Sequence, residues 1–481
     1  MVAREPLMPD PSQVPAEDAP PKKGDRWLKV IYWAVGVLAV LAVLGAFWLR
    51  HIDAEHQKIL REARSAVEGL RVPEVPDEDN AARLYGKAYT LFSISPQDIS
   101  SKYTNRLESF DLEIGSDEIA KLLTDNAAAL AALAQAAEEP HCVFVTDYSA
   151  GVAVKLPSLL HARAASLLLA VAARRAAHDG KHAEAAERIR QALCLSRGIA
   201  QPRTLITHLI GGACEDVTII ALRDTLTQTE PDAKSLHVLL AILAEHVAKR
   251  PTLQDALHGE RLSRMLSAAE ITANPGWRLT PRGFSGLSLR DARTCEKIWD
   301  WAERMQDQPA HEAFQEWRRT DHTKQLEKLG VPYSLIMPAF PAGFRSWMEH
   351  TGLLRCARLA VACRLHKLRA GALPADLKEL AGFFPKDFAE VSADPFSGRP
   401  MLYQRSETGF VVYSVGAWDP RDNGAPDPYV RTNDPDLTFA VDPKLWAEYR
   451  AERVQALQKR AKPGPPPKPG VAAPRPPPPA R

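Results

Sequence analysis

The chain has 481 residues, of which 45% are hydrophobic and 25% are charged, and its formal net charge is only +2. This is the composition of an ordinary globular protein, with length for about two to three domains. Lysine and arginine are spread along the chain rather than gathered in blocks, so the sequence gives no reason to expect a nucleic-acid partner.

Residues 1–26 form a polar, proline-rich arm, for which we predict disorder on the cytoplasmic side. Residues 27–50 contain an uncharged apolar run at 30–49. At ~1.5 Å per residue a helix of this length reaches ~30 Å, the thickness of the hydrocarbon core of a bilayer. Aromatic residues lie near its ends, where they prefer the membrane–water interface: Trp27, Tyr32, Trp33 and Trp48. We therefore predict one transmembrane anchor, with the lipid bilayer as its partner.

This run has two alternative interpretations. A cleaved signal peptide has an apolar core of ~7–15 residues and a small-x-small cleavage site. Here the run is longer and ends in Phe47-Trp48-Leu49, which favours an uncleaved signal-anchor. A buried core helix usually keeps a polar face, and this run has none. The basic pair Lys22-Lys23 favours a cytoplasmic N-terminus and an extracytoplasmic body.

Helical patterns continue after the anchor. We expect a helical stalk at 51–72 and a helical domain at 73–350, with helices at 80–92, 116–139 and through 156–247. Residues 142–148 predict a short strand or an extended connector, and the apolar, proline-interrupted segment 331–344 predicts a buried connector or a small membrane-facing patch. Near Gly180, two amphipathic patterns joined by a tight turn predict an αα-hairpin.

This hairpin, at about 160–198, resembles one tetratricopeptide-type repeat through Gly180, Ala185 and Ala192. A second copy at the expected spacing of ~34 residues is not evident. An isolated αα-hairpin in a helical domain is the alternative interpretation.

The character of the chain changes over residues 351–442. A helix stopped by Gly371 leads into two β-rich runs joined across 405–409, which predicts a β-hairpin. A charged helix at 443–460 and a proline-rich disordered tail at 461–481 follow. The predicted fold class is mainly α: a transmembrane helix, an αα-hairpin body and a small α+β module at the C-terminal end.

Short motifs within about 352–440 resemble the C-terminal half of type II secretion major pseudopilins. Residues 371–374 read Gly-Ala-Leu-Pro, 394–400 read Asp-Pro-Phe-Ser-Gly-Arg-Pro, and 413–416 read Tyr-Ser-Val-Gly, in the order of the pseudopilin motifs. Asp436-Leu437 takes the place of their final Asp-Ile pair. The whole chain also resembles uncharacterised single-pass bacterial envelope proteins that combine a helical body with such an ending.

The pseudopilin resemblance implies a structural calcium ion, because the corresponding pseudopilin loop holds one. Hard oxygen ligands for Ca²⁺ could come from Asp419, Asp422, Asn423, Asp434 and Asp436. The spacing of these residues fits no EF-hand. The alternative is that they cap turns and face solvent.

Motifs that dictate a reaction are missing: there is no HExxH, no GxSxG, no GxxxxGK[ST], and no GxGxxG after a strand. Histidines and glutamates scattered over several predicted helices could converge on a metal, or could stay separate: His161, His208, His237, His246 and His258, with Glu215, Glu245 and Glu260. Asp255-x-x-His258-x-Glu260 is the densest polar cluster. Cys194 and Cys214 could form a bridge in an exported body, or all six cysteines could be small buried residues.

These patterns favour a non-enzymatic envelope protein that binds other envelope proteins through its helical body. An anchored hydrolase with a site assembled from dispersed histidines and carboxylates is one alternative, and an accessory component of a type II secretion or pilus-like machine is another. A deep pocket with converging histidines and carboxylates of shifted pKa would favour the enzyme.

Overall fold

The computed structural model describes residues 23–70, 75–108, 112–144, 146–278, 280–320, 329, 340–416, 437–448 and 451. Within these ranges the chain is mainly helical, with one small antiparallel sheet near its C-terminal end. The predicted fold class is therefore confirmed.

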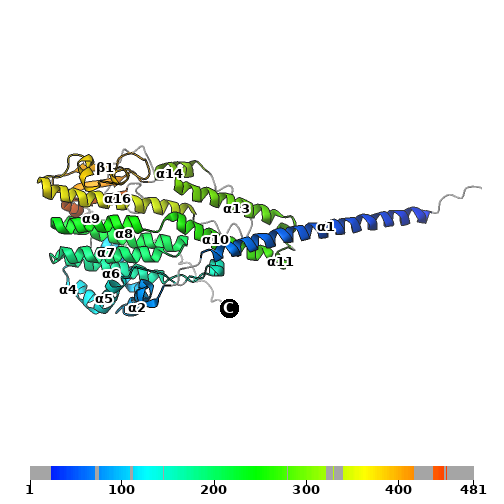
Figure 1. Cartoon of the computed structure of the whole chain (residues 1–481), viewed down its shortest axis with the longest axis horizontal. Coiled ribbons are helices and arrows are strands. Elements are labelled where there is room, and N and C mark those ends of the chain that lie inside the picture. Colours follow the sequence, from blue (N-terminus) through cyan, green and yellow to red (C-terminus); the bar gives the residue numbers. More distant parts are fainter. Residues whose placement is uncertain are drawn as a thin grey trace, which may run out of the picture.

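One long helix, α1 (Lys23–Glu68), begins the described chain, runs without a break through the predicted anchor and ends at Glu68 within the predicted stalk. Its first half projects away from the rest of the molecule (Figure 1), and its side chains are exposed. Burial begins at Ile52, and Leu60 and Val67 then pack against Leu266 of α10 (Leu253–Ala273). The second half of α1 is thus amphipathic and docked on the body, whereas the first half is apolar all around.

The centre of the body is a group of three helices, α6 (Leu159–His178), α7 (His182–Ala200) and α8 (Leu205–Gln228), which pack on one another. Gly180 links α6 to α7 with a φ of 74°, a backbone conformation that L side chains rarely adopt, and this turn confirms the predicted αα-hairpin. Helix α8 is also long and apolar enough to cross a membrane, but 72% of its apolar window is buried inside the body. It is a core helix.

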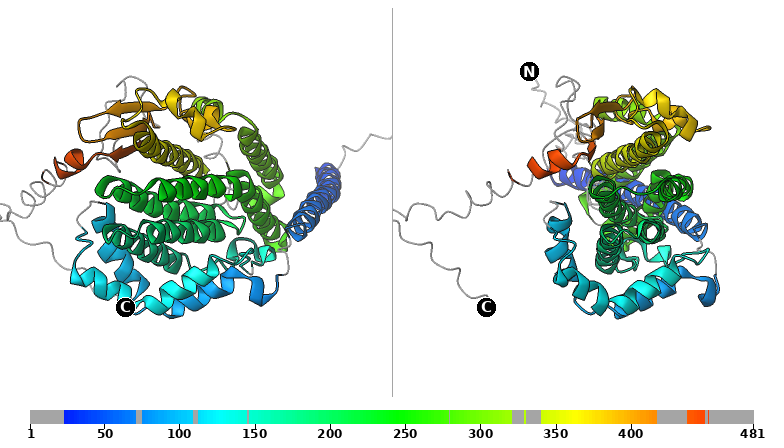
Figure 2. Two further views of the ribbon diagram at one scale, coloured as in Figure 1. Left: turned by 60° about the vertical axis from the view of Figure 1, so that its left-hand side comes forward. Right: turned by 90° about the vertical axis from the view of Figure 1, so that its left-hand side faces the viewer.

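A layer of shorter helices covers one side of this centre (Figure 2). The segment 116–139, predicted as one helix, forms two helices that are separated at Asn126. The Asn126 side chain accepts a hydrogen bond from the Ser93 amide at 2.9 Å. The polar segment 96–108 was not predicted to be helical, but it forms a helix that packs on the body through buried Ile99 and Tyr103. The described residues of 142–148 include no strand, so this segment is a connector. The elements of this layer are η1 (Asp77–Asp79), α2 (Ala81–Thr90), α3 (Pro96–Glu108), α4 (Asp117–Asp125) and α5 (Ala127–Ala136). The next element, η2 (Tyr148–Ala153), packs against α10 and α1.

The other side of the centre is covered by helices from the second half of the chain. The longest of them crosses the predicted domain boundary at 350/351 without interruption. Buried Met348 and Leu354, on either side of this boundary, belong to two different core clusters, which the one helix joins. Most of the predicted connector at 331–344 lies outside the described residues. The helices are α9 (Ala233–Lys249), α10, α11 (Pro275–Arg278), α12 (Pro281–Phe284), α13 (Leu287–Arg304), η3 (Met305–Asp307), α14 (Ala310–Arg319) and α16 (Phe340–Ala370).

The sheet has the order β1-β2-β3 and follows η5 (Leu377–Phe383) and α17 (Phe388–Val391). Strands β1 (Leu402–Arg405) and β2 (Phe410–Ser414) confirm the predicted hairpin, and β3 (Leu437–Val441) is a strand that was not predicted. Alternate side chains of β2 face opposite ways, as strand geometry requires. Phe410 and Val412 join the core formed by α8, α9 and α16, and Val411 packs with Trp446 on the other face.

Asp394 connects two of the motifs behind the pseudopilin resemblance. Its Oδ1 accepts hydrogen bonds from the amides of Phe396 and Ser397 at 2.8 and 2.9 Å, and its Oδ2 accepts one from the amide of Val415 at 2.8 Å. The residue is 1% exposed. A buried carboxylate satisfied by three backbone amides therefore fixes the 394–400 turn against the end of β2.

A candidate functional site between α8, α9 and α16

Helix α8 carries ionisable residues in an otherwise apolar sequence. His208 and Glu215 lie seven residues apart, hence on one face, and Asp216 follows directly. Because α8 is surrounded by other helices, His208 and Glu215 leave water when the body folds, and Asp216 does so in part. Burying them without partners would be costly, so their surroundings decide what they can do.

The carboxylate of Glu215 faces α9. Its Oε2 lies 2.7 Å from Nε2 of His246, and its Oε1 lies 3.6 Å from Nη1 of Arg250 just beyond the end of α9. Burial opposes ionisation, but the charge of Arg250 and the hydrogen bond from His246 outweigh it and lower the pKa of Glu215 to about 2. Burial also disfavours the charged form of His246, and for an imidazole this lowers the pKa. The pair is thus a carboxylate that accepts a hydrogen bond from a neutral imidazole.

The neighbouring Asp216 faces α16. Its Oδ1 lies 2.8 Å from Nδ1 of His350, and Nε2 of the same imidazole lies 2.8 Å from Oγ of Ser346, one turn earlier on α16. Burial would lower the pKa of His350, but the Asp216 carboxylate more than offsets this and raises it. Acid, imidazole and hydroxyl therefore stand in the order found in serine hydrolases.

His208 is the unpartnered member of the group. It is 4% exposed, and among the described residues neither of its ring nitrogens has a hydrogen-bond partner. Burial and the nearby charge of Arg250 lower its pKa to about 3. The ring lines a small cavity of about 10 Å³ together with Glu215 and Arg250. This is space for about one water molecule, not for a substrate.

Two consecutive glycines bring the helices close enough for these contacts. A methyl group on Gly211 would lie 2.8 Å from Cβ of Ala200 on α7, and one on Gly212 would overlap the imidazole of His350. The spacing of α7, α8 and α16 at this crossing therefore depends on the absence of side chains at these positions.

The geometry defines two chemical possibilities. The Glu215–His246 pair is sealed, since the two side chains are 2% and 0% exposed, and it can serve only as a polar link between helices. The second group reaches the surface, because the side chain of Asp216 is 32% exposed and Ser346 is half-buried. Ser346 lies inside α16, however, where backbone amides are used by the helix, so it brings no oxyanion hole of its own.

The residues proposed from sequence as a metal cluster are only partly brought together. His208, Glu215 and His246 meet at this site, and the others are dispersed. The remaining ones are placed as follows: His161 beside Ser158 at 2.5 Å, His258 beside Glu303, Glu245 beside Lys249, Glu260 beside Arg264, and His237 in solvent. Within the described ranges, no three histidine, cysteine or acidic side chains are grouped so that they could hold a metal ion.

Asp255 is not part of a cluster with His258 and Glu260 but closes a capping box with Thr252 at the start of α10. The proposed calcium ligands, Asp419, Asp422, Asn423, Asp434 and Asp436, lie outside the described residues. Cys194 and Cys214 are both free thiols, so the bridge between them is not formed.

Sequence reasoning missed Asp216, Arg250, Ser346 and His350. A signal for the first was present, since two adjacent acidic residues and two adjacent glycines interrupt an apolar helix. The spacing of four between Ser346 and His350 places them on one helix face. Their partner on α8 is about 130 residues away and depends on tertiary packing.

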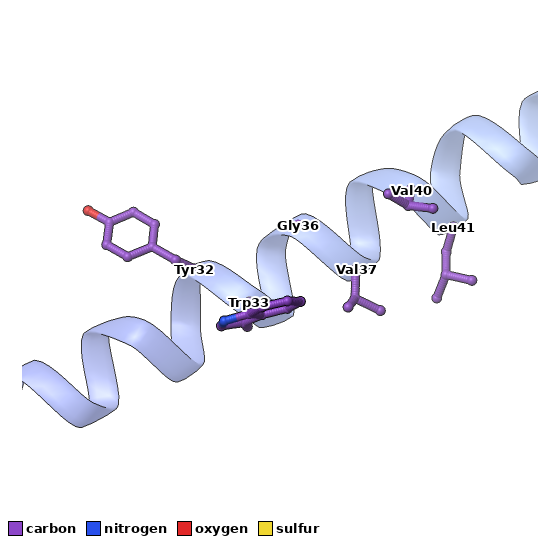
Figure 3. Close-up of a pocket in the computed structure, with 6 residues that line it drawn as sticks. All are labelled: Tyr32, Trp33, Gly36, Val37, Val40 and Leu41. Carbon is purple, nitrogen blue, oxygen red and sulfur yellow. The ribbon is translucent and has the colours of Figure 1, made fainter.

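A separate hollow lies on the apolar half of α1 and is lined by one helix alone (Figure 3). Gly36 leaves a gap between the rings of Tyr32 and Trp33 and the aliphatic side chains that follow. With no opposing wall and almost no polar atom, this hollow is an apolar surface rather than a reaction site.

Comparison of the chain with protein-family models, with curated proteins and with solved structures finds no match.

Proposed function

We propose that this protein is a single-pass membrane protein that holds a helical binding module at the extracytoplasmic face of a bacterial membrane. The observation that supports the anchor is the exposed first half of α1. Fifteen large apolar side chains between Trp27 and Trp48 are 47–77% exposed. Water-soluble surfaces do not carry a continuous apolar patch of this extent, and a bilayer would cover it on all sides.

The continuity of α1 favours an uncleaved anchor over a removable signal peptide. The helix that would be removed is the same helix that buries Ile52 at 0% exposure and continues along α10. Trp48, at the end of the apolar half, also lies against the body beside Gly286. The apolar half is thus joined to the folded body without a loop in which a peptidase could cut.

The anchor is tested by extracting membranes with carbonate. The full-length protein should stay in the membrane pellet, and Leu38→Arg with Leu41→Arg should release it, since each arginine at mid-membrane costs ~2.5–3.5 kcal/mol. The matched control is Ala54→Arg with Ser65→Arg, two exposed positions on the docked half of the same helix, and this variant should be retained. Release of the unmodified protein would refute the anchor.

The binding role is supported by the character of the buried polar site, which links helices and leaves room for about one water molecule. It is tested by crosslinking the tagged protein in membranes and purifying it under denaturing conditions. Specific envelope proteins should be recovered with the full chain. Pseudopilins among them would place it as an accessory component of a secretion machine, and recovery of lipid alone would refute a protein-binding role.

A serine hydrolase is the second candidate, favoured by the Asp216–His350–Ser346 arrangement. A fluorophosphonate probe should then label the protein, and Ser346→Ala should abolish the labelling. Ser158→Ala is the matched control, because Ser158 also lies beside a histidine, His161, in a pair for which no carboxylate contact is seen among the described residues. Absence of labelling in the unmodified protein would refute this candidate.

A further inference from the structure

One end of the body lies level with the point at which α1 leaves it. Figure 1 shows α11 and the start of α13 at this end, beside α1. A side chain on Gly286, between α12 and α13, would touch Trp48 and Ile52 of α1 at 3.6 Å, and Oγ of Ser288 lies 3.0 Å from Nε2 of His56. This end of the body, residues 275–278 and 280–290, is called the tip below.

The length of the apolar half places the membrane surface at the tip. From Trp27 to Trp48 there are 21 helical steps, which at ~1.5 Å each span ~32 Å. This matches the hydrocarbon core of a bilayer, with an aromatic residue at each interface. If Trp27 lies at the far interface, Trp48 lies at the near one, and Gly286 lies beside it.

The exposed chemistry of the tip suits lipid headgroups. Leu287 is 40% exposed at the first turn of α13, and Arg290 is exposed on the next turn. Arg50 and His51 are exposed on the adjacent part of α1. An apolar side chain among arginines is the combination that inserts between headgroups while the cations contact lipid phosphates.

The connection between anchor and tip has no hinge. Residues 46–68 of α1 contain neither glycine nor proline and form one helix. The tip is therefore held at a fixed depth and cannot swing away from the bilayer while α1 remains docked.

We propose that the tip rests in the headgroup layer of the same bilayer that α1 crosses, so that the body has one defined orientation on the membrane. The proposal rests on the membrane anchor proposed above. The partner is a phospholipid surface, with anionic phosphate as the group that the arginines contact.

The test uses the full-length protein in nanodiscs of phosphatidylcholine and phosphatidylglycerol, with nitroxide labels at single introduced cysteines and the unmodified protein as the background. The labels are Leu287→Cys at the tip, Leu41→Cys in the anchor and Leu368→Cys, whose side chain is 53% exposed near the end of α16. Collision with oxygen and with a water-soluble nickel complex reports the depth of each label.

We expect Leu287→Cys to show a several-fold higher ratio of oxygen to nickel collisions than Leu368→Cys, at a depth near the phosphates. Leu41→Cys should report the hydrocarbon core. If Leu287→Cys resembles Leu368→Cys while Leu41→Cys is deep, the tip proposal is wrong and the anchor stands. If the label at Leu41→Cys is in water, the proposed membrane anchor is refuted, and the tip proposal is refuted with it.

Discussion

His208 illustrates what a single buried base does to the stability of this body. Its imidazole is neutral in the folded state because burial lowers its pKa to about 3, and it has no hydrogen-bond partner among the described residues. In the unfolded chain the same ring titrates near pH ~6.5. Between these two values the unfolded state binds the proton more tightly, so acid favours unfolding.

We therefore expect His208 to make the body less stable as the pH falls below ~6.5 and to continue doing so down to about 3. Between pH ~7 and ~5 the loss from this residue is about 2 kcal/mol. His208→Phe should remove that part of the pH dependence. The measurement is urea unfolding of the detergent-solubilised protein at both pH values.

The control for this experiment is His237→Phe on the exposed face of α9, which should keep the pH dependence of the unmodified protein. Equal slopes for His208→Phe and the unmodified protein would show that His208 is charged or partnered in the folded state.

At this scale the sequence identifies residue types but not their partners. His208, Glu215 and His246 were named as residues that could converge, and they do. The reason is not local, because Glu215 and His246 lie on different helices whose packing brings them within 2.7 Å. His350 was not considered, since its carboxylate partner belongs to α8 and no short-range pattern indicates that contact.

The crossing of α8 with α7 and α16 depends on the absence of side chains at two positions. Gly212 lies against the ring of His350, which also binds Asp216 at 2.8 Å. Glycine inside a helix is otherwise unfavourable by ~0.5–1 kcal/mol relative to alanine. Its presence here is explained by close packing, which offsets that cost.

Gly212→Ala should consequently destabilise the body, by ~1–3 kcal/mol as for other overpacked cores. Gly86→Ala in α2 is the matched control: no described atom lies within 4 Å of the added methyl group, and the change should stabilise the body by ~0.5–1 kcal/mol. Thermal unfolding of both variants in the same detergent measures the difference. Equal shifts for the two variants would contradict close packing at α8.

Helices and strands with a strong local signal were predictable, and those stabilised by distant contacts were not. The apolar run of α1, the glycine turn at Gly180 and the hairpin of β1 and β2 each follow from a short stretch of sequence. By contrast, α3 is polar and is held by two buried side chains, and β3 is a strand through its pairing with β2, more than twenty residues earlier in the chain. The first turns of α16 likewise pack against distant residues, through buried Phe344 and Met348.

For the whole molecule, the decisive feature is that the proposed anchor and the body share one helix. Because α1 has no break, the orientation of the body is set by the orientation of the apolar half of α1. The body is elongated along the direction of α1, so its sheet lies at the end far from the anchor (Figure 1). Helix α16 alone, with 31 residues, extends for ~46 Å.

Inserting a flexible Gly-Gly-Ser segment after Arg50 should uncouple the two parts. We expect the nitroxide at Leu287→Cys to become water-exposed, while carbonate extraction and the unfolding temperature of the body stay unchanged. An insertion of three alanines, which extends the helix instead, serves as the control: it should keep the two parts rigidly coupled but rotate them by about 300°, since each residue turns a helix by ~100°. An unchanged depth of the label after the flexible insertion would mean that the tip binds lipid independently of α1.

The unbroken α1 also restricts how copies of this protein can assemble. With α1 as the proposed anchor, all copies in one membrane point the same way, and a body that cannot tilt on this helix presents its flanks, never its far end, to a neighbour. Two-fold axes lying in the plane of the bilayer are then excluded, which rules out dihedral arrangements. Any closed homo-oligomer must be a ring around an axis normal to the membrane, with its subunits in contact side by side.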